Sequence, residues 1–231
     1  MDVGRTGLPL SRICVGTWGE NRAAGSLIAV GVWIDEQSAD ALAQLSIRDA
    51  ASLTPGEAAS WGRRLLEVVP CEVVKLKPRK YNALWRRFGS RDRVLNFCYL
   101  KAIEVLMDCY PDTCAVTYSI TAPAFAVLAG EIRPRGDIDL IYLSPSGLPK
   151  DQGINAAEVL ARAHYDRELG ALLEHLGLAS PETTPEVIES VARDQHDATW
   201  MEPLINQWGH AGIFRLFKRD TDIAEQALAS R

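Results

Sequence analysis

Positive charge is concentrated between residues 75 and 93, where eight lysines and arginines accompany one acid, Asp92. The chain of 231 residues as a whole has a formal net charge of −5. A dense basic stretch in an acidic protein can contact the phosphates of a nucleic acid. A solvated helix face, neutralised by acids elsewhere in the fold, would give the same pattern. The cations predicted to bind nucleic acid are Lys77, Arg79, Lys80, Arg86, Arg87, Arg91 and Arg93, with Lys150 outside the segment.

Other residue types with reactive side chains form no recognisable motif. The five cysteines include no Cys-x-x-Cys pair and the four histidines are scattered, so no zinc site is predicted. Most of the cysteines lie in apolar runs, which is typical of small buried residues in a reducing compartment. The sequence also lacks a Gly-x-Ser-x-Gly motif, a phosphate-binding loop and a His-Glu-x-x-His motif.

The composition is that of a globular protein. Hydrophobic residues make up 47% of the chain and charged residues 24%, which argues against a disordered or fibrous protein. Apolar runs are too short to cross a membrane, and the first residues do not have the pattern of a signal peptide. We therefore expect a cytoplasmic protein with no membrane association.

The hydrophobic patterns predict strands that alternate with helices after an initial hairpin. Thr54, Pro55 and Glu57 predict a capped helix start, and Ser38 is expected to cap the helix before it. Strands are expected over 12–17, 27–34, 72–77, 113–120 and 138–143, and helices over 35–44, 54–69, 78–87, 90–110, 123–129 and 151–176. This order predicts an α/β fold, with a five-stranded mixed sheet flanked by helices. A single domain is expected over 1–231, with a core at about 11–178 and a helical C-terminal extension at about 183–231.

Several segments resemble the catalytic domain of ribonuclease HIII and, more loosely, ribonuclease HII. Residues 73–84 resemble a strand of that family followed by Pro-x-x-Tyr-Asn-x-Leu, and 47–54 resemble its Val-x-Asp-Ser-Lys-x-Leu segment. Residues 93–96 and 101–106 are similar to the helix that follows, and 154–162 to an alanine-rich helix start ending in Ile-Ala-Arg. Residues 209–217 resemble the family's Val-Ala-Lys-Leu-His-Phe ending. The order and spacing agree over residues 12–228.

The resemblance implies a ribonuclease H fold and cleavage of RNA paired with DNA. In the family, four carboxylates hold two divalent metal ions, because Mg²⁺ prefers oxygen ligands and two ions can stabilise the attacking and leaving oxygens. The family also has a separate N-terminal substrate-binding domain. This chain begins almost at the first strand, so no counterpart of that domain is expected.

The four matching carboxylate positions are not acidic in this sequence; they are Trp18, Gly19, Thr117 and Leu148. The family's Gly-x-Gly loop and the lysine of its Asp-Ser-Lys segment are also missing, the latter replaced by Ala51. Without four negative ligands, two Mg²⁺ ions cannot be held. Three nearby acids, Glu20, Asp151 and Asp166, are the candidates for relocated ligands.

From these substitutions we predict a catalytically inactive relative of the family, with no catalytic residue, no metal site and no cofactor. It would bind nucleic acid (an RNA–DNA hybrid, a duplex or a single strand) through the basic segment, or it would be a structural subunit with protein partners in a larger assembly. The alternative is an active ribonuclease H that cleaves RNA in RNA–DNA hybrids with Mg²⁺ and relocated carboxylates. The spacing of Tyr81, Leu84 and Trp85 predicts that these side chains face the core and leave the neighbouring cations in solvent.

Overall fold

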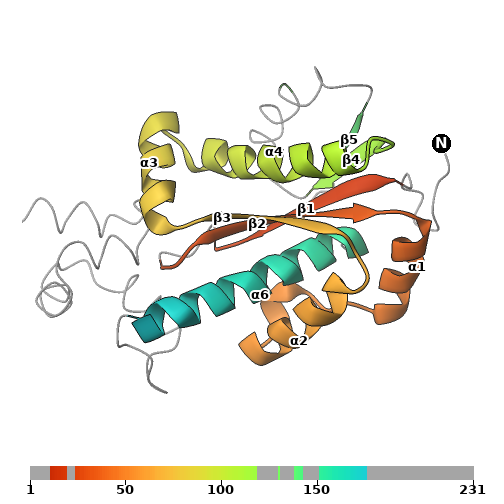
Figure 1. Ribbon diagram of the computed structural model, residues 1–231, viewed down its shortest axis with the longest axis horizontal. Coiled ribbons are helices and arrows are strands. Elements are labelled where there is room, and N and C mark those ends of the chain that lie inside the picture. The colour runs from red at the N-terminus through yellow and green to blue at the C-terminus, as the bar shows by residue number, and fades with distance from the viewer. Residues whose placement is uncertain (1–10, 20–23, 119–129, 131–137, 143–150, 176–231) are drawn as a thin grey trace, which may run out of the picture.

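The protein is built around a five-stranded sheet with the strand order β3-β2-β1-β4-β5. The computed structural model describes residues 11–19, 24–118, 130, 138–142 and 151–175 (Figure 1). The strands are β1 (Arg12–Trp18), β2 (Leu27–Ile34), β3 (Cys71–Leu76), β4 (Ala115–Tyr118) and β5 (Asp139–Tyr142). Strand β2 is antiparallel to both of its neighbours, β1 and β3, whereas β4 is parallel to β1 and β5 is parallel to β4. The predicted mixed sheet is confirmed.

Helices cover both faces of this sheet. They are α1 (Glu36–Leu45), the 3-10 helix η1 (Ala50–Ser52), α2 (Pro55–Leu66), α3 (Pro78–Phe88), α4 (Arg91–Cys109) and α6 (Gln152–His175). Figure 1 shows α4 on one face and α1, α2 and α6 on the other. Each face has its own apolar core. Strand β2 is therefore apolar along nearly its whole length, because both of its faces are covered.

The helix starts are fixed by side-chain caps. The Thr54 hydroxyl accepts from the Glu57 backbone N–H, and the Glu57 carboxylate accepts from the Thr54 N–H, which confirms the predicted capping box. In α1 the cap is Asp35 and not Ser38. The Asp35 carboxylate accepts from the Ser38 N–H at 2.8 Å, and Ser38 is the reciprocal partner of that box. The position of the cap was predicted wrongly because both residue types favour it.

Small residues allow α6 to pack closely on β1. Ala156 and Ala157 are fully buried. A Cβ atom on Gly16 would lie only 2.7 Å from the backbone nitrogen of Glu158, so a larger residue at position 16 would push the helix away. This contact sets the position of the helix start against the middle of the sheet.

The apolar surroundings of the cysteines predict that they are buried, and this is true of only some of them. Cys14 and Cys98 are buried, Cys71 and Cys114 are half-buried, and Cys109 is exposed; all five are free thiols. Burial raises the pKa of the Cys98 thiol to about 12, so it stays protonated. The predicted helix at 123–129, the C-terminal extension at 183–231 and the outer limits of the domain lie outside the described residues.

Candidate functional site

Three elements meet at one buried point on the α6 face of the sheet. The parallel register of β1 and β4 places Cys14 directly beside Thr117, and their Sγ and Oγ1 atoms are 2.9 Å apart. The Cys14 thiol is also 3.4 Å from the Asp151 carboxylate. In the family that the chain resembles, the metal-binding carboxylates lie at the end of the first strand, on the strand after the long helix and just before the alanine-rich helix. In this structure those elements converge at Cys14, Thr117 and Asp151.

Asp151 has two structural roles at this point. Its Oδ1 atom accepts from the backbone N–H groups of Gly153 and Ile154, at 2.9 Å and 3.2 Å, and so stabilises the first turn of α6. Its Oδ2 atom accepts from the Arg12 guanidinium at 3.0 Å, and both side chains are at most 5% exposed. The Asp151 carboxylate is thus neutralised by Arg12 within the protein.

The Cys14 thiol lies in the same buried cluster. Complete burial and the neighbouring Asp151 carboxylate raise its pKa far above the ordinary range, although Arg12 acts in the opposite direction. Cys14 is therefore a neutral thiol that can donate a hydrogen bond to Asp151. It is not a thiolate, the form in which cysteine binds metals or acts as a nucleophile.

Trp18 and Gly19 lie at the other end of β1. Four residues separate Trp18 from Cys14, which corresponds to about 13 Å along a strand. The Arg162 guanidinium lies 4.9 Å from the centre of the Trp18 ring and donates to the Ala50 carbonyl at 2.6 Å and to Asp166 at 3.3 Å. Of the predicted positions of lost carboxylates, Thr117 therefore lies at the meeting point and Trp18 and Gly19 do not.

The backbone at Gly19 leaves no room for a side chain. Its φ angle is +87°, and a Cβ atom there would lie 2.6 Å from the Ser26 carbonyl oxygen and 2.9 Å from the Tyr165 ring. An acid at this position would require the strand end to move. Leu148, Lys150 and Glu20 lie outside the described residues.

The described residues do not form a two-metal site. No group of three or more histidine, cysteine, aspartate or glutamate side chains in the described part of the chain could hold a metal ion. Asp151 and Asp166 are paired with Arg12 and Arg162. Fifteen residues separate these two acids, about 22 Å along a helix axis, whereas paired catalytic ions lie about 4 Å apart. Asp151 and Asp166 therefore cannot both belong to one relocated ligand set.

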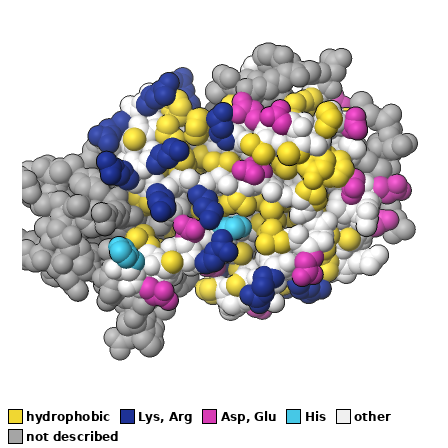
Figure 2. All heavy atoms as spheres, in the orientation of Figure 1, with side chains coloured by type: hydrophobic (Ala, Val, Ile, Leu, Met, Phe, Trp, Pro, Cys, Tyr) yellow, Lys and Arg dark blue, Asp and Glu magenta, His cyan; other side chains and the backbone are white. Residues whose placement is uncertain are grey.

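The basic segment lies over β3, α3 and the start of α4. Tyr81 is buried, and Leu84 and Trp85 are half-buried against the core beneath α4, so the predicted inner face of α3 is confirmed. The seven segment cations of the predicted nucleic-acid set are exposed; they are Lys77, Arg79, Lys80, Arg86, Arg87, Arg91 and Arg93. Figure 2 shows lysine and arginine side chains gathered over α3 and continuing across β3 towards α6 and α2.

Arg12 and Cys14 are the site residues that sequence reasoning missed. Arg12 stands 139 residues before its partner Asp151, and Cys14 stands 103 residues before Thr117. The pairing of β1 with β4 brings Cys14 to Thr117, and the packing of α6 on β1 brings Arg12 to Asp151. The available signal was the arginine at the start of an otherwise apolar strand, because a buried charge requires a partner.

Sequence comparison finds proteins named Ribonuclease HIII. The one from Chlamydia trachomatis serovar L2 (strain ATCC VR-902B) is 29% identical over 167 residues, which cover 70% of this chain and 54% of the relative. The chain thus spans about half the length of the curated relatives it matches. No protein-family model matches it.

Structure comparison finds the same family of folds. A crystal structure of Bst-RNase HIII in complex with Mn²⁺ superimposes with a TM-score of 0.71, at 19% identity, over 95% of this chain and 70% of that chain. The PCNA:RNase HII complex from Archaeoglobus fulgidus gives a TM-score of 0.62, also at 19% identity, over 81% of this chain and 92% of the matched one. At this level of identity the two structures establish the fold.

These comparisons correct the prediction of function. The curated relatives are named as an enzyme, so the prediction of a catalytically inactive binding protein or structural subunit is wrong on these comparisons. The alternative, an active ribonuclease H, is better supported. The prediction that no cofactor is needed is not supported either, since one solved relative was determined with Mn²⁺.

No helix in the described ranges is long and apolar enough to cross a membrane. The strand order and flanking helices confirm the predicted ribonuclease H fold. Sequence similarity to the relatives confirms the resemblance seen in the motifs. The chain is thus similar in sequence to proteins named Ribonuclease HIII and shares the fold of the solved RNase HII and HIII structures.

Proposed function

We propose that the chain is a metal-dependent ribonuclease H that cleaves the RNA strand of RNA–DNA hybrids. The observation that carries this proposal is the 29% identity to a protein named Ribonuclease HIII over 70% of the chain. The shared fold supports it. The reaction would be hydrolysis of a phosphodiester bond in the RNA strand, as the name of the relatives implies.

The described residues do not supply the carboxylates that the family uses, so no catalytic step can be assigned to a metal ion from them. Two locations for the site are possible, one at Asp151 near Cys14 and one at Asp166 near Trp18, and the two acids differ in exposure. Both acids are paired with an arginine, Asp151 with Arg12 and Asp166 with Arg162, but the Asp151 side chain is only 2% exposed, whereas that of Asp166 is 14% exposed and lines a groove beside α6. We therefore place the reaction at the Trp18 end of β1, where Glu20 follows in the sequence, and not at the Cys14 end.

Cleavage of a labelled RNA–DNA hybrid, with Mg²⁺ or Mn²⁺ and with EDTA, tests the proposal. Glu20→Gln and Asp166→Asn should each abolish a metal-dependent cut. The double variant Arg12→Met/Asp151→Asn should preserve it, because no buried charge is left without a partner and asparagine also caps a helix start. If this double variant is folded but does not cleave, the site belongs at the Cys14 end.

The basic segment is proposed as the main nucleic-acid contact. The exposed positions of Arg86 and Arg87 on α3 support this role. If both contact phosphates, replacing both by alanine should flatten the slope of log affinity against log salt by about one to two. Binding of hybrid, duplex and single strand should weaken alike, since phosphate contacts carry no sequence information. Unchanged binding of all three would remove the segment from the interface.

A further inference from the structure

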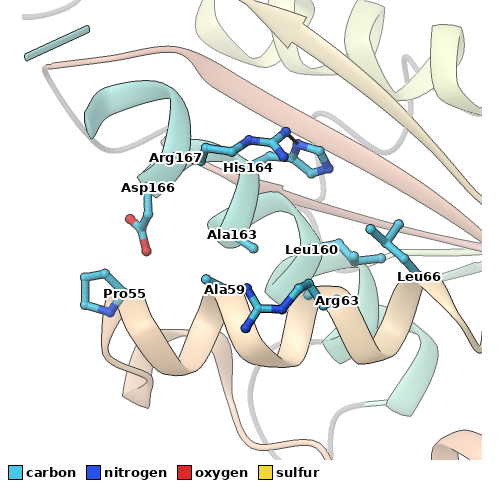
Figure 3. Close-up of a pocket in the computed structure, with 10 residues that line it drawn as sticks. Pro55, Ala59, Arg63, Leu66, Leu160, Ala163, His164, Asp166 and Arg167 are labelled. Carbon is cyan, nitrogen blue, oxygen red and sulfur yellow. Dashed lines mark hydrogen bonds between the residues drawn. The ribbon is translucent and has the colours of Figure 1, made fainter. Parts of the chain in front are cut away.

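A groove between α2 and α6 carries two arginines on its rim. It has a volume of about 400 Å³, and its floor is made of small and aliphatic residues, among them Ala59, Leu160 and Ala163. Arg63 from α2 and Arg167 from α6 line it together with His164 and Asp166 (Figure 3). Gly62 keeps the two helices close, since a Cβ atom there would lie 2.8 Å from the Ala163 Cβ.

The charge in this groove is positive. Asp166 is paired with Arg162, so its carboxylate is already neutralised. Within the described part of the chain, no hydrogen bond or ion pair of the exposed Arg63 guanidinium is found. Arg167 is also exposed, and among the described residues its guanidinium contacts His164 and forms no ion pair with an acid. The two guanidinium groups are therefore the charges that the groove presents to solvent.

His164 holds Arg167 in place. The Arg167 Nη2 atom is 2.7 Å from His164 Nδ1, so the neutral imidazole can accept a hydrogen bond from the guanidinium. Burial, followed by the nearby Arg167 and Lys75 charges, lowers the pKa of His164, although Glu168 opposes this shift. A neutral His164 keeps this contact at neutral pH and leaves the guanidinium charged.

Lys75 connects this groove to the basic segment. Its Nζ atom lies 3.0 Å from the Glu168 carboxylate, which ties β3 to α6 beside His164. Positive side chains consequently extend from α3 across β3 to α6 and α2 on one face of the molecule (Figure 2). A path of basic side chains, interrupted where Glu168 pairs with Lys75, fits a polyanion that is longer than a single phosphate group.

We propose that the groove between α2 and α6 binds the phosphodiester backbone of a nucleic-acid strand, with Arg63 and Arg167 as the phosphate contacts. The strand would also contact the exposed cations of α3. This inference rests on the proposed function, because the groove borders Asp166, where we place the reaction. Guanidinium groups suit this role, since they can donate two parallel hydrogen bonds to one phosphate.

The test is fluorescence anisotropy of a labelled RNA–DNA hybrid, titrated in EDTA at several salt concentrations. EDTA separates binding from cleavage, so a chain that does not cleave can still confirm the groove, and a chain that cleaves can still refute it. The double variant Arg63→Gln/Arg167→Gln should flatten the slope of log affinity against log salt by about one to two. Arg167→Lys alone should leave the slope at the parent value, because the charge is kept.

Lys101→Gln is the matched control, since it removes an exposed cation on α4 that is paired with Glu104. It should leave the slope unchanged. The inference is overturned if the double variant, with an unchanged melting temperature, binds with the parent's affinity and slope. It is also overturned if Lys101→Gln reduces the slope as much as the loss of one groove arginine. Equal competition by polyglutamate and by unlabelled hybrid would indicate an acidic protein partner instead.

Discussion

Arg12 and Asp151 form a buried ion pair between the first residue of β1 and the residue before α6, with 3.0 Å between Nη2 and Oδ2. The pair joins β1 to the start of α6 where these two elements meet β4. Arg12 neutralises the Asp151 carboxylate. The same carboxylate caps α6 by accepting hydrogen bonds from the backbone N–H groups of its first turn.

Removing only one partner of this pair should be costly. Arg12→Met leaves the Asp151 charge buried and uncompensated, and we expect a loss of about 3–5 kcal/mol in the free energy of unfolding. The double variant Arg12→Met/Asp151→Asn removes both charges and keeps a capping side chain, so it should recover most of that loss. Urea denaturation of the parent and both variants measures the difference. Equal stability of the single and double variants would show that the ion pair is unimportant.

Gly19 should not tolerate a side chain. Its positive φ angle and the 2.6 Å approach of its Cβ position to the Ser26 carbonyl predict that Gly19→Ala destabilises the fold by more than about 1 kcal/mol. Gly56, in the first turn of α2, has nothing within 4 Å of its Cβ position. Gly56→Ala should therefore be neutral or stabilise by up to about 1 kcal/mol. A Gly19→Ala variant as stable as Gly56→Ala would contradict the described strand end.

His164 should make stability depend on pH. Its pKa is lowered in the folded state, by burial and then by Arg167 and Lys75, so the unfolded chain binds a proton that the folded chain excludes. The contribution of the neutral ring is present above the ordinary histidine pKa and is lost as the pH falls below about 6.5. His164→Gln should therefore lose less stability than the parent between pH 7.5 and pH 5.5. Parallel melting-temperature curves for the two proteins would exclude this effect.

The elements could be predicted from the sequence because their signals are local. The apolar run over 27–34 and the caps at Thr54 and Ser90 lie within a few residues of the elements they define. The register between β1 and β4 carries no such signal, because it joins Cys14 to Thr117 across 103 residues. The composition of the meeting point was therefore missed, although the three elements that form it were predicted.

The basic surface shows the same limit. The cations of residues 75–93 are neighbours in the sequence, so their concentration was visible at once. Arg63 and Arg167 come from separate helices, and only the packing of α2 on α6 places them in one groove. Hydrophobic periodicity predicts which face of each helix is buried, but it does not predict which other helix lies beside it.

The most direct measurement of the proposed function is a time course of RNA cleavage with a labelled RNA–DNA hybrid in millimolar Mn²⁺ or Mg²⁺. Single-stranded RNA and duplex DNA of the same sequence serve as comparison substrates. An active ribonuclease H predicts that the RNA strand of the hybrid is cut, that both comparison substrates stay intact and that EDTA stops the reaction. If the purified, folded chain leaves the hybrid intact in Mg²⁺ and also in Mn²⁺, the proposed activity is contradicted.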